Sequence, residues 1–235
     1  MKWLPNGRMW FEPDEIEKTM EQELQKANLL PPLETPAVDL ERLIQRHLGA
    51  ALDQYADLGQ GVLGKTEFYS DAIPKVFINR MLTDAVDEDD CPAGVKGRWR
   101  ATMAHEAAHL ILHRILYDPQ LVQLTMNGMS RPSDRAQLLR CGQGDISFRK
   151  ATDWREIQAN LGMAALLMPR SRFTASVQAA MKALGVSSAE VGSPIAIDLI
   201  GQMARRFQVS RQAATIRFET LRLLSPAGQP TLAGI

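Results

Sequence analysis

Apolar residues recur at helical spacing over several long stretches of the chain. Residues 12–30 begin with acidic side chains and end in leucines before Pro31 and Pro32, which predicts a helix there. Leucines and an isoleucine at helical spacing predict a second helix over 38–58. Longer helices are expected at 97–116 and 153–168, because no proline interrupts either stretch. The apolar face expected for the last of these helices comprises Trp154, Ile157, Leu161, Ala164 and Met168.

Short runs of β-forming residues separate the second of these helices from the third. They predict strands at 61–69 and 75–79. Residues 84–90 contain five acidic residues in seven, which indicates a solvated loop in preference to a cation site. Residues 118–152 are of mixed polarity and contain several glycines, so we expect a loop-rich insert with one short helix at 135–139. Helices combined with a small sheet predict an α+β fold.

Composition places the chain among ordinary globular proteins. It has 235 residues, of which 45% are hydrophobic and 23% charged. Lys+Arg and Asp+Glu number 27 each, which argues against a chain that mainly coats nucleic acid. The apolar runs are too short to cross a membrane and the N-terminus lacks an apolar signal core, so we expect a cytoplasmic protein. Cys91 and Cys141 form no CxxC motif, and reduced thiols are the simplest interpretation.

Three of the four histidines lie in the helix expected at 97–116, where His105-Glu-Ala-Ala-His109 forms an HExxH motif. Residues four apart stack on one helix face, so both imidazoles can reach one zinc ion at about 2 Å. Glu106 lies about 100° around the helix, beside the metal, where it can act as the general base that takes a proton from water. The alternative is a pair of stacked surface histidines, which the specificity of the motif disfavours.

A catalytic zinc ion needs a third protein ligand. His113 lies about 12 Å along the helix from His105, so we interpret it as a residue that supports a ligand or fills the core. Glu156 is the better candidate, with Asn160 one turn later in position to orient a ligand histidine. Spacing alone leaves open whether Glu156 is a ligand or the third residue of a capping box that Asp153 begins. Other donors within reach in sequence are Asp118, Asp134, Asp145, Cys141 and Asp153.

Two blocks of the sequence resemble the ImmA/IrrE family of zinc metallopeptidases, of the gluzincin type. One block is 100–113, with the HExxH motif; the other is 154–169, with Glu156-Ile-Gln-Ala-Asn160 and a terminal Leu-Leu-Met-Pro. The resemblance extends over roughly 38–224 and implies a zincin-like fold with a bound Zn²⁺. By this resemblance the zinc ligands are His105, His109 and Glu156, and Glu106 is the general base.

The resemblance also implies how the chain is organised. We expect a helical arm at 1–37, outside the match, a zincin-like metallopeptidase domain at 38–180, and a helical segment at 181–235 packed on it. His109 and Glu156 are 47 residues apart, which is long for the family and indicates an insert that covers the site or shapes its specificity. We expect no C-terminal sensor domain.

Residues 195–224 are expected to form a helix, a short turn and a second helix, with Ser210 as a good N-cap. This segment is locally basic, and a helix-turn-helix of this kind could read DNA. The alternative is a packed helical pair whose arginines are solvated. The arginines concerned are Arg205, Arg206, Arg211, Arg217 and Arg222.

The favoured hypothesis is a zinc-dependent endopeptidase, with a strand near 62–79 that pairs with an extended substrate. The resemblance implies that the substrate is a helix-turn-helix repressor or an antitoxin-like regulator, which is cut to relieve repression. The alternatives are a DNA-binding regulator with a structural zinc ion and a zinc peptidase of short peptides. The residue that stabilises the oxyanion stays open among Tyr55, Tyr69, Tyr117 and His47.

Overall fold

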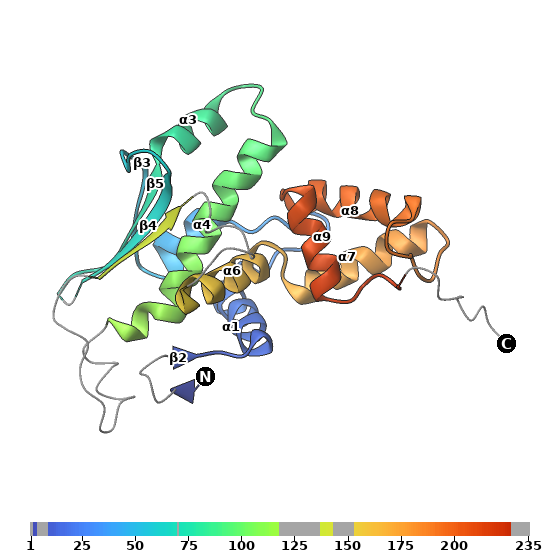
Figure 1. The fold of residues 1–235 in the computed structure, drawn as a ribbon, viewed down its shortest axis with the longest axis horizontal. Helices are drawn as coiled ribbons and strands as arrows, with labels where there is room; N and C mark the ends of the chain where they lie inside the picture. The colour runs from blue at the N-terminus through green and yellow to red at the C-terminus, as the bar shows by residue number, and fades with distance from the viewer. Residues whose placement is uncertain (1, 4–8, 70, 118–136, 143–152, 227–235) are drawn as a thin grey trace.

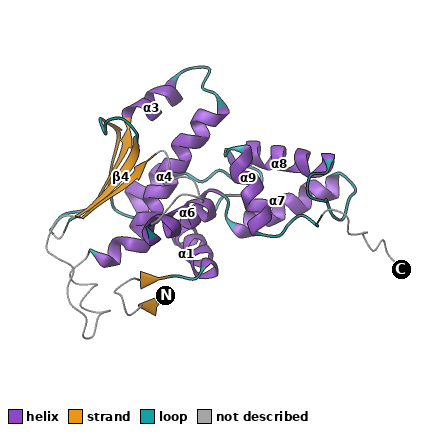
Figure 2. Ribbon diagram, in the orientation of Figure 1, coloured by secondary structure: helices purple, strands orange, loops and turns teal. Residues whose placement is uncertain are grey.

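The computed structural model describes residues 2–3, 9–69, 71–117, 137–142 and 153–226 (Figure 1). Over these residues the fold is mixed α+β, as expected, with helices arranged beside a four-stranded sheet and a separate two-stranded sheet near the N-terminus (Figure 2). Within the described part of the chain, no helix is both long enough and apolar enough to cross a membrane.

Helix α1 spans Pro13–Lys26 and confirms the first expected helix, with a shorter C-terminal end. Glu12 and Glu15 form a reciprocal capping box at its start, and Pro13 fits the first turn because no hydrogen bond is needed there. Asn28, with a φ of 56°, turns the chain away after the last turn. The buried face packs against α6 (Trp154–Leu167) and comprises Ile16, Met20 and Leu24.

The helix expected at 38–58 is wrong beyond its first half. Helix α2 (Leu40–Arg42) continues into the π-helical turn η1 (Leu43–His47), and the chain then enters strand β3 (Ala51–Ala56). Gly49 has a φ of 64°, which is costly for other residues and ends the helical path. Strand β3 then pairs in parallel with β5 (Lys75–Asn79), so sheet hydrogen bonds override the helical spacing of the leucines.

The main sheet has four strands within the described residues, in the order β3-β5-β4-β6. Strands β4 (Val62–Phe68) and β5 confirm the two expected strands and pair antiparallel to each other. Strand β6 (Gln137–Gly142) pairs antiparallel with β4, so the short helix expected at 135–139 is wrong for 137–139. Both edges of β4 and of β5 are therefore filled, and an extended substrate cannot pair with either as expected. The rest of the expected insert, 118–136 and 143–152, lies outside the described residues.

The acidic run at 84–90 is exposed, as expected, but it is not all loop. Its first half completes helix α3 (Arg80–Asp87), which begins where the side chain of Asn79 accepts a hydrogen bond from the Met81 backbone. A chain that carries charge on one face can still form a helix when its other face is buried, and here Leu82 and Thr83 are buried.

Helix α4 (Ala93–His113) is the centre of the molecule and ends in the short 3₁₀ turn η2 (Arg114–Leu116). It begins at Ala93, before the expected start at Gly97, because Pro92 fits the position that precedes a helix. Strand β4 contacts one side of α4 and helix α6 contacts another, so α4 lies between the sheet and α6 (Figure 1). Its buried middle section carries the HExxH motif.

Helix α6 confirms the helix expected at 153–168, but the expected apolar face is not the buried one. Ile157 is 39% exposed, and of that face only Met168 is fully buried. Because α6 packs closely on α4, its buried face combines small and polar residues with a few larger apolar ones. These include Gln158, Ala159, Asn160, Gly162, Met163, Ala165 and Leu166.

Three more helices form a cluster on the C-terminal side of α6 (Figure 1). They are α7 (Arg170–Ala183), α8 (Pro194–Phe207) and α9 (Arg211–Thr220). Helices α8 and α9 confirm the expected helix, turn and helix, and the side chain of Ser210 caps α9 by accepting from the Ala213 backbone. At the other end of the chain, strands β1 (Lys2–Trp3) and β2 (Met9–Trp10) form a small antiparallel ribbon.

Candidate metal centre

Three predicted ligands meet between α4 and α6. The Nε2 atoms of His105 and His109 lie 3.0 Å apart, and both side chains are fully buried. One carboxylate oxygen of Glu156 lies 3.0 Å from the Nε2 of His105, and the other lies 3.4 Å from that of His109. Asp153 caps α6 by accepting a hydrogen bond from the Arg155 backbone. The Glu156 carboxylate, at the third position of α6, contacts the histidines, which favours the ligand role over the capping box.

The spacing of these donor atoms fits one metal ion. Two histidine nitrogens and a carboxylate oxygen can be chosen that all lie within 4.8 Å of one another. Tetrahedral zinc, with bonds of about 2.0–2.1 Å, separates neighbouring ligand atoms by about 3.4 Å, close to the contacts observed here. The set of two imidazoles and one carboxylate is also a known donor set for catalytic zinc, and it leaves one position for water or substrate.

Glycine at position 162 lets the two ligand-bearing helices approach each other. A Cβ added to Gly162 would lie 2.8 Å from the Cβ of Ala108, which is shorter than real carbon contacts. Met20 from α1 and Leu112 from α4 close the same space from other directions. The absence of a side chain at 162 therefore sets the distance between α4, with its histidines, and α6, with Glu156.

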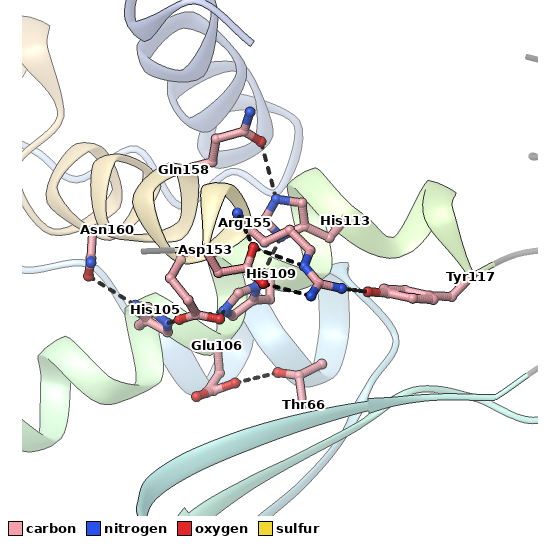
Figure 3. Close-up of polar contacts among 11 residues, drawn as sticks. Thr66, His105, Glu106, His109, His113, Tyr117, Asp153, Arg155, Gln158 and Asn160 are labelled. Carbon is pink, nitrogen blue, oxygen red and sulfur yellow. Dashed lines mark hydrogen bonds and ion pairs between the residues drawn. The ribbon is translucent and has the colours of Figure 1, made fainter. Parts of the chain in front are cut away.

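Glu106 faces the sheet beside the three donors. The Thr66 hydroxyl of β4 donates a hydrogen bond to its Oε2 at 2.6 Å (Figure 3). Its Oε1 is buried and has no hydrogen-bond partner within the described residues. A Cβ on Gly64 would lie 2.8 Å from that Oε1, so glycine keeps this part of β4 clear. Burial raises the pKa of Glu106 to about 7, a value suited to a group that exchanges protons near neutral pH.

The charge on Glu156 is stabilised by its neighbours. Burial alone would raise the pKa of this carboxyl, but hydrogen bonds to His105 and His109 outweigh burial and hold the pKa well below its usual range. Burial also lowers the pKa of His109, which favours the neutral imidazole that a metal requires. The site thus combines an anionic carboxylate with the neutral imidazole of His109.

The two residues expected to support the ligands both lie behind them. The Oδ1 of Asn160 is 3.2 Å from the Nδ1 of His105, which suits the orienting role that the sequence suggested (Figure 3). The Nδ1 of His113 is 2.9 Å from the Nδ1 of His109. Two contacting residues were not anticipated, Thr66 and Gln158. Only packing reveals them, because a threonine in a strand and a glutamine in a helix carry no distinguishing local pattern.

Among the expected oxyanion candidates, Tyr117 is the one bonded to a residue adjacent to Glu156. Its hydroxyl accepts a hydrogen bond of 2.8 Å from Arg155 (Figure 3). Its ring stacks on Phe68 of β4. Each of the other three candidates contacts an acidic side chain. Those pairs are Tyr55 with Asp87, Tyr69 with Glu67, and His47 with Glu23.

The alternative metal donors do not join this group within the described residues. Asp153 caps α6 and pairs with Arg155 at 2.7 Å. Asp118, Asp134, Asp145 and the side chain of Cys141 lie outside the described residues.

Part of the chain matches a known protein family. Residues 136–219 match the model of the IrrE N-terminal-like domain, a family of M78 peptidases. The match confirms the resemblance to the ImmA/IrrE family. The IrrE-like stretch includes Glu156 and Asn160, and the structure brings it against the HExxH helix that precedes it. It supports a metallopeptidase, a hydrolase of peptide bonds. No curated protein matches the chain.

Proposed function

We propose that this chain is a zinc-dependent endopeptidase that hydrolyses a peptide bond in a protein regulator. The observation that carries the proposal is the triangle of donor atoms from two buried histidines, His105 and His109, and the partly buried Glu156, with Glu106 beside it. A structural zinc ion has all four positions filled by protein, whereas three protein donors leave a position for the reacting groups. The donor set therefore favours catalysis over a purely structural metal.

The contacts of each residue suggest its role in the proposed reaction. A zinc ion held by the three donors supplies Lewis acidity, which lowers the pKa of water and polarises a carbonyl group. Glu106 receives the proton of the attacking water at Oε1, the oxygen that has no partner within the described residues. Thr66 holds the other oxygen, so the carboxylate cannot rotate away from this task. Tyr117 is our candidate for the group that stabilises the oxyanion.

Our proposal for the substrate is a helix-turn-helix repressor or an antitoxin-like regulator. Its support is the resemblance to the ImmA/IrrE family together with the IrrE-like match. Because both edges of β4 and β5 are filled, we propose that an extended substrate pairs at an outer edge of the sheet, along β6 or β3.

Two features of the C-terminal pair argue against the alternative of a DNA-binding regulator. Arg217, one of the arginines that gave the pair its basic character, is buried and pairs with Glu17 of α1. The turn before α9 also packs on α4, since a Cβ on Gly97 would lie 3.4 Å from the Ser210 backbone nitrogen. A recognition helix needs its N-terminal end free to enter the major groove, and here α4 lies beside that end.

Cleavage can be tested by labelling new N-termini in extracts of the source organism. One extract receives the zinc-loaded wild-type protein and the other receives Glu106→Gln, which keeps the three metal donors. We expect a new N-terminus within a helix-turn-helix regulator only in the wild-type extract, because the variant cannot accept the proton.

The control and the other outcomes separate the hypotheses. New termini that appear equally with Glu106→Gln come from contaminating proteases, and without wild-type-specific termini the endopeptidase proposal fails. Wild-type-specific cleavage confined to short peptides supports the peptidase of short peptides instead. Cleavage of a regulator without a helix-turn-helix contradicts the proposed substrate class and leaves the reaction intact.

A further inference from the structure

A chain of buried polar groups extends from His109 away from the metal centre. The Nδ1 of His109 lies 2.9 Å from the Nδ1 of His113, and the Nε2 of His113 lies 3.2 Å from the Oε1 of Gln158. The amide nitrogen of Gln158 in turn donates to the backbone carbonyl of Met9 at 3.2 Å. Each of these four residues is at most 1% exposed. Figure 3 shows His113 between His109 and Gln158.

The Met9 carbonyl fixes which group donates and which accepts along this series of polar contacts. A backbone carbonyl only accepts hydrogen bonds, so the amide NH₂ of Gln158 faces it and the amide oxygen faces His113. That oxygen is also only an acceptor, so the Nε2 of His113 carries a hydrogen. In a neutral imidazole the other nitrogen is then an acceptor, and it accepts from the Nδ1–H of His109. The Nε2 of His109 is left with the lone pair that a metal needs.

The ring of Trp154 packs edge-on against His113, with centroids 5.7 Å apart, and restricts its rotation. His113 therefore keeps one ring nitrogen toward Gln158 and the other toward His109. The direction of the hydrogen bonds follows from this geometry.

We propose that Gln158 and His113 are positioning residues that fix His109 in the tautomer with a metal-facing Nε2 lone pair. The inference deepens the proposed function and rests on it. It also ties the metal centre to the N-terminal ribbon, because the carbonyl that sets the direction belongs to Met9 of β2. On the opposite side of the donor group, His105 has its own orienting contact with Asn160.

Two nearly isosteric substitutions separate hydrogen bonding from packing. In His113→Asn the side-chain oxygen takes the place of Nδ1 and can still accept from His109, whereas His113→Leu puts a methyl group there. Both lose the contact to Gln158, so they differ mainly in the acceptor. With Zn²⁺ alone as the probe, competition against a chelator should give a zinc affinity about 10–100-fold lower for His113→Leu. His113→Asn should stay within about threefold of the wild type, because the outer contact of His109 is kept.

The tautomers can also be measured directly in the wild-type protein. This test does not depend on whether a variant folds. Long-range ¹H–¹⁵N NMR spectra should show His109 protonated at Nδ1 in the zinc-loaded protein. They should show His113 protonated at Nε2 with and without zinc. The inference is overturned if His113 carries its hydrogen on Nδ1. It is also overturned if the two folded variants, checked by circular dichroism, bind zinc equally well or equally badly.

Failure of the proposed function would give results that differ from failure of the positioning role. A wild-type protein that binds no zinc would contradict the endopeptidase, whatever the tautomers are. The metal-free spectra would still report the direction of the chain from Met9 to His109. Normal zinc binding by the wild type with the opposite His113 tautomer would overturn only the positioning role.

Discussion

Burial affects the protonation of Glu106, the residue that we propose as the general base. In the metal-free protein its carboxyl is fully buried, and desolvation raises its pKa to about 7 from the ordinary 4.5. A carboxyl whose pKa is higher in the folded than in the unfolded protein stabilises the fold below its unfolded pKa. That contribution is lost as the pH rises through the folded pKa, here between 4.5 and about 7.

Glu106→Gln should therefore stabilise the metal-free protein at high pH. With a chelator present, we expect the variant and the wild type to unfold alike at pH 4.5. At pH 8 the variant should be more stable by about 3 kcal/mol at most. Urea unfolding at the two pH values measures this difference. Added zinc should shrink it, because a nearby dication favours the carboxylate. If the stability difference between the variant and the wild type were the same at pH 4.5 and pH 8, it would contradict the raised pKa of Glu106.

Residue types and spacing made part of this site predictable. His105, Glu106 and His109 share one helix, so their geometry follows from the helical repeat. Glu156 was ambiguous from spacing alone, since the third position of a helix suits both a capping carboxylate and a metal ligand. Thr66 could not be predicted, because its role depends on strand β4 lying against α4.

At the scale of elements, the closeness of α4 and α6 determines whether the donors can meet. Glycine in the middle of a helix costs about 1 kcal/mol relative to alanine, so Gly162 needs a packing reason. The reason is the neighbouring Ala108, whose Cβ would lie 2.8 Å from a Cβ at 162. The same close approach explains why small and polar residues take much of the buried face of α6, which apolar periodicity could not foresee.

Gly162→Ala should push α6 away from α4. We expect overpacking to destabilise the protein by about 1–3 kcal/mol, partly offset by better helix propensity, and zinc affinity to fall because Glu156 moves with α6. Calorimetric zinc titration measures the second effect. The double variant Gly162→Ala/Ala108→Gly removes the contact and should recover zinc binding. Wild-type zinc affinity in Gly162→Ala would contradict this role of the helix contact.

Across the whole molecule, Arg217 joins three segments that are far apart in sequence. It lies on α9 and donates to the backbone carbonyl of Met168, where α6 ends, through Nε at 3.0 Å and Nη2 at 2.7 Å. It also pairs with Glu17 of α1 through both terminal nitrogens. The helix at 13–26 is thereby fixed to the rest of the fold, and the basic residue that suggested DNA binding serves packing instead.

Arg217→Met should destabilise the protein by about 3–5 kcal/mol, because Glu17 and the Met168 carbonyl lose a buried partner. Chemical denaturation measures the loss. Arg205→Met is the matched control, since Arg205 is exposed on α8, and should change stability by no more than about 0.5 kcal/mol. Zinc affinity should stay unchanged in both variants while they are folded. If Arg217→Met were as stable as Arg205→Met, the Arg217 contacts would contribute nothing to the stability of the fold.

The organisation of the helices was largely predictable from the sequence, but the sheet was less so. Runs of β-forming residues predict strands β4 and β5, whereas no such run predicts β3 or β6. The segment 51–56 has helical spacing and becomes a strand only because β5 is available to pair with it. Pairing of 137–142 with β4 is likewise a long-range contact, and single-sequence patterns carry no information about such partners.

Zinc affinity of the purified protein tests the central claim most directly. It should be compared in the wild type, Glu156→Ala and Glu106→Gln by competition with a chelator. We predict about one zinc ion per wild-type chain, near-normal binding by Glu106→Gln, and a sharp loss in Glu156→Ala. Full zinc binding by Glu156→Ala would contradict the proposed ligand set, and a wild-type protein without zinc under metal-replete conditions would contradict the metallopeptidase itself.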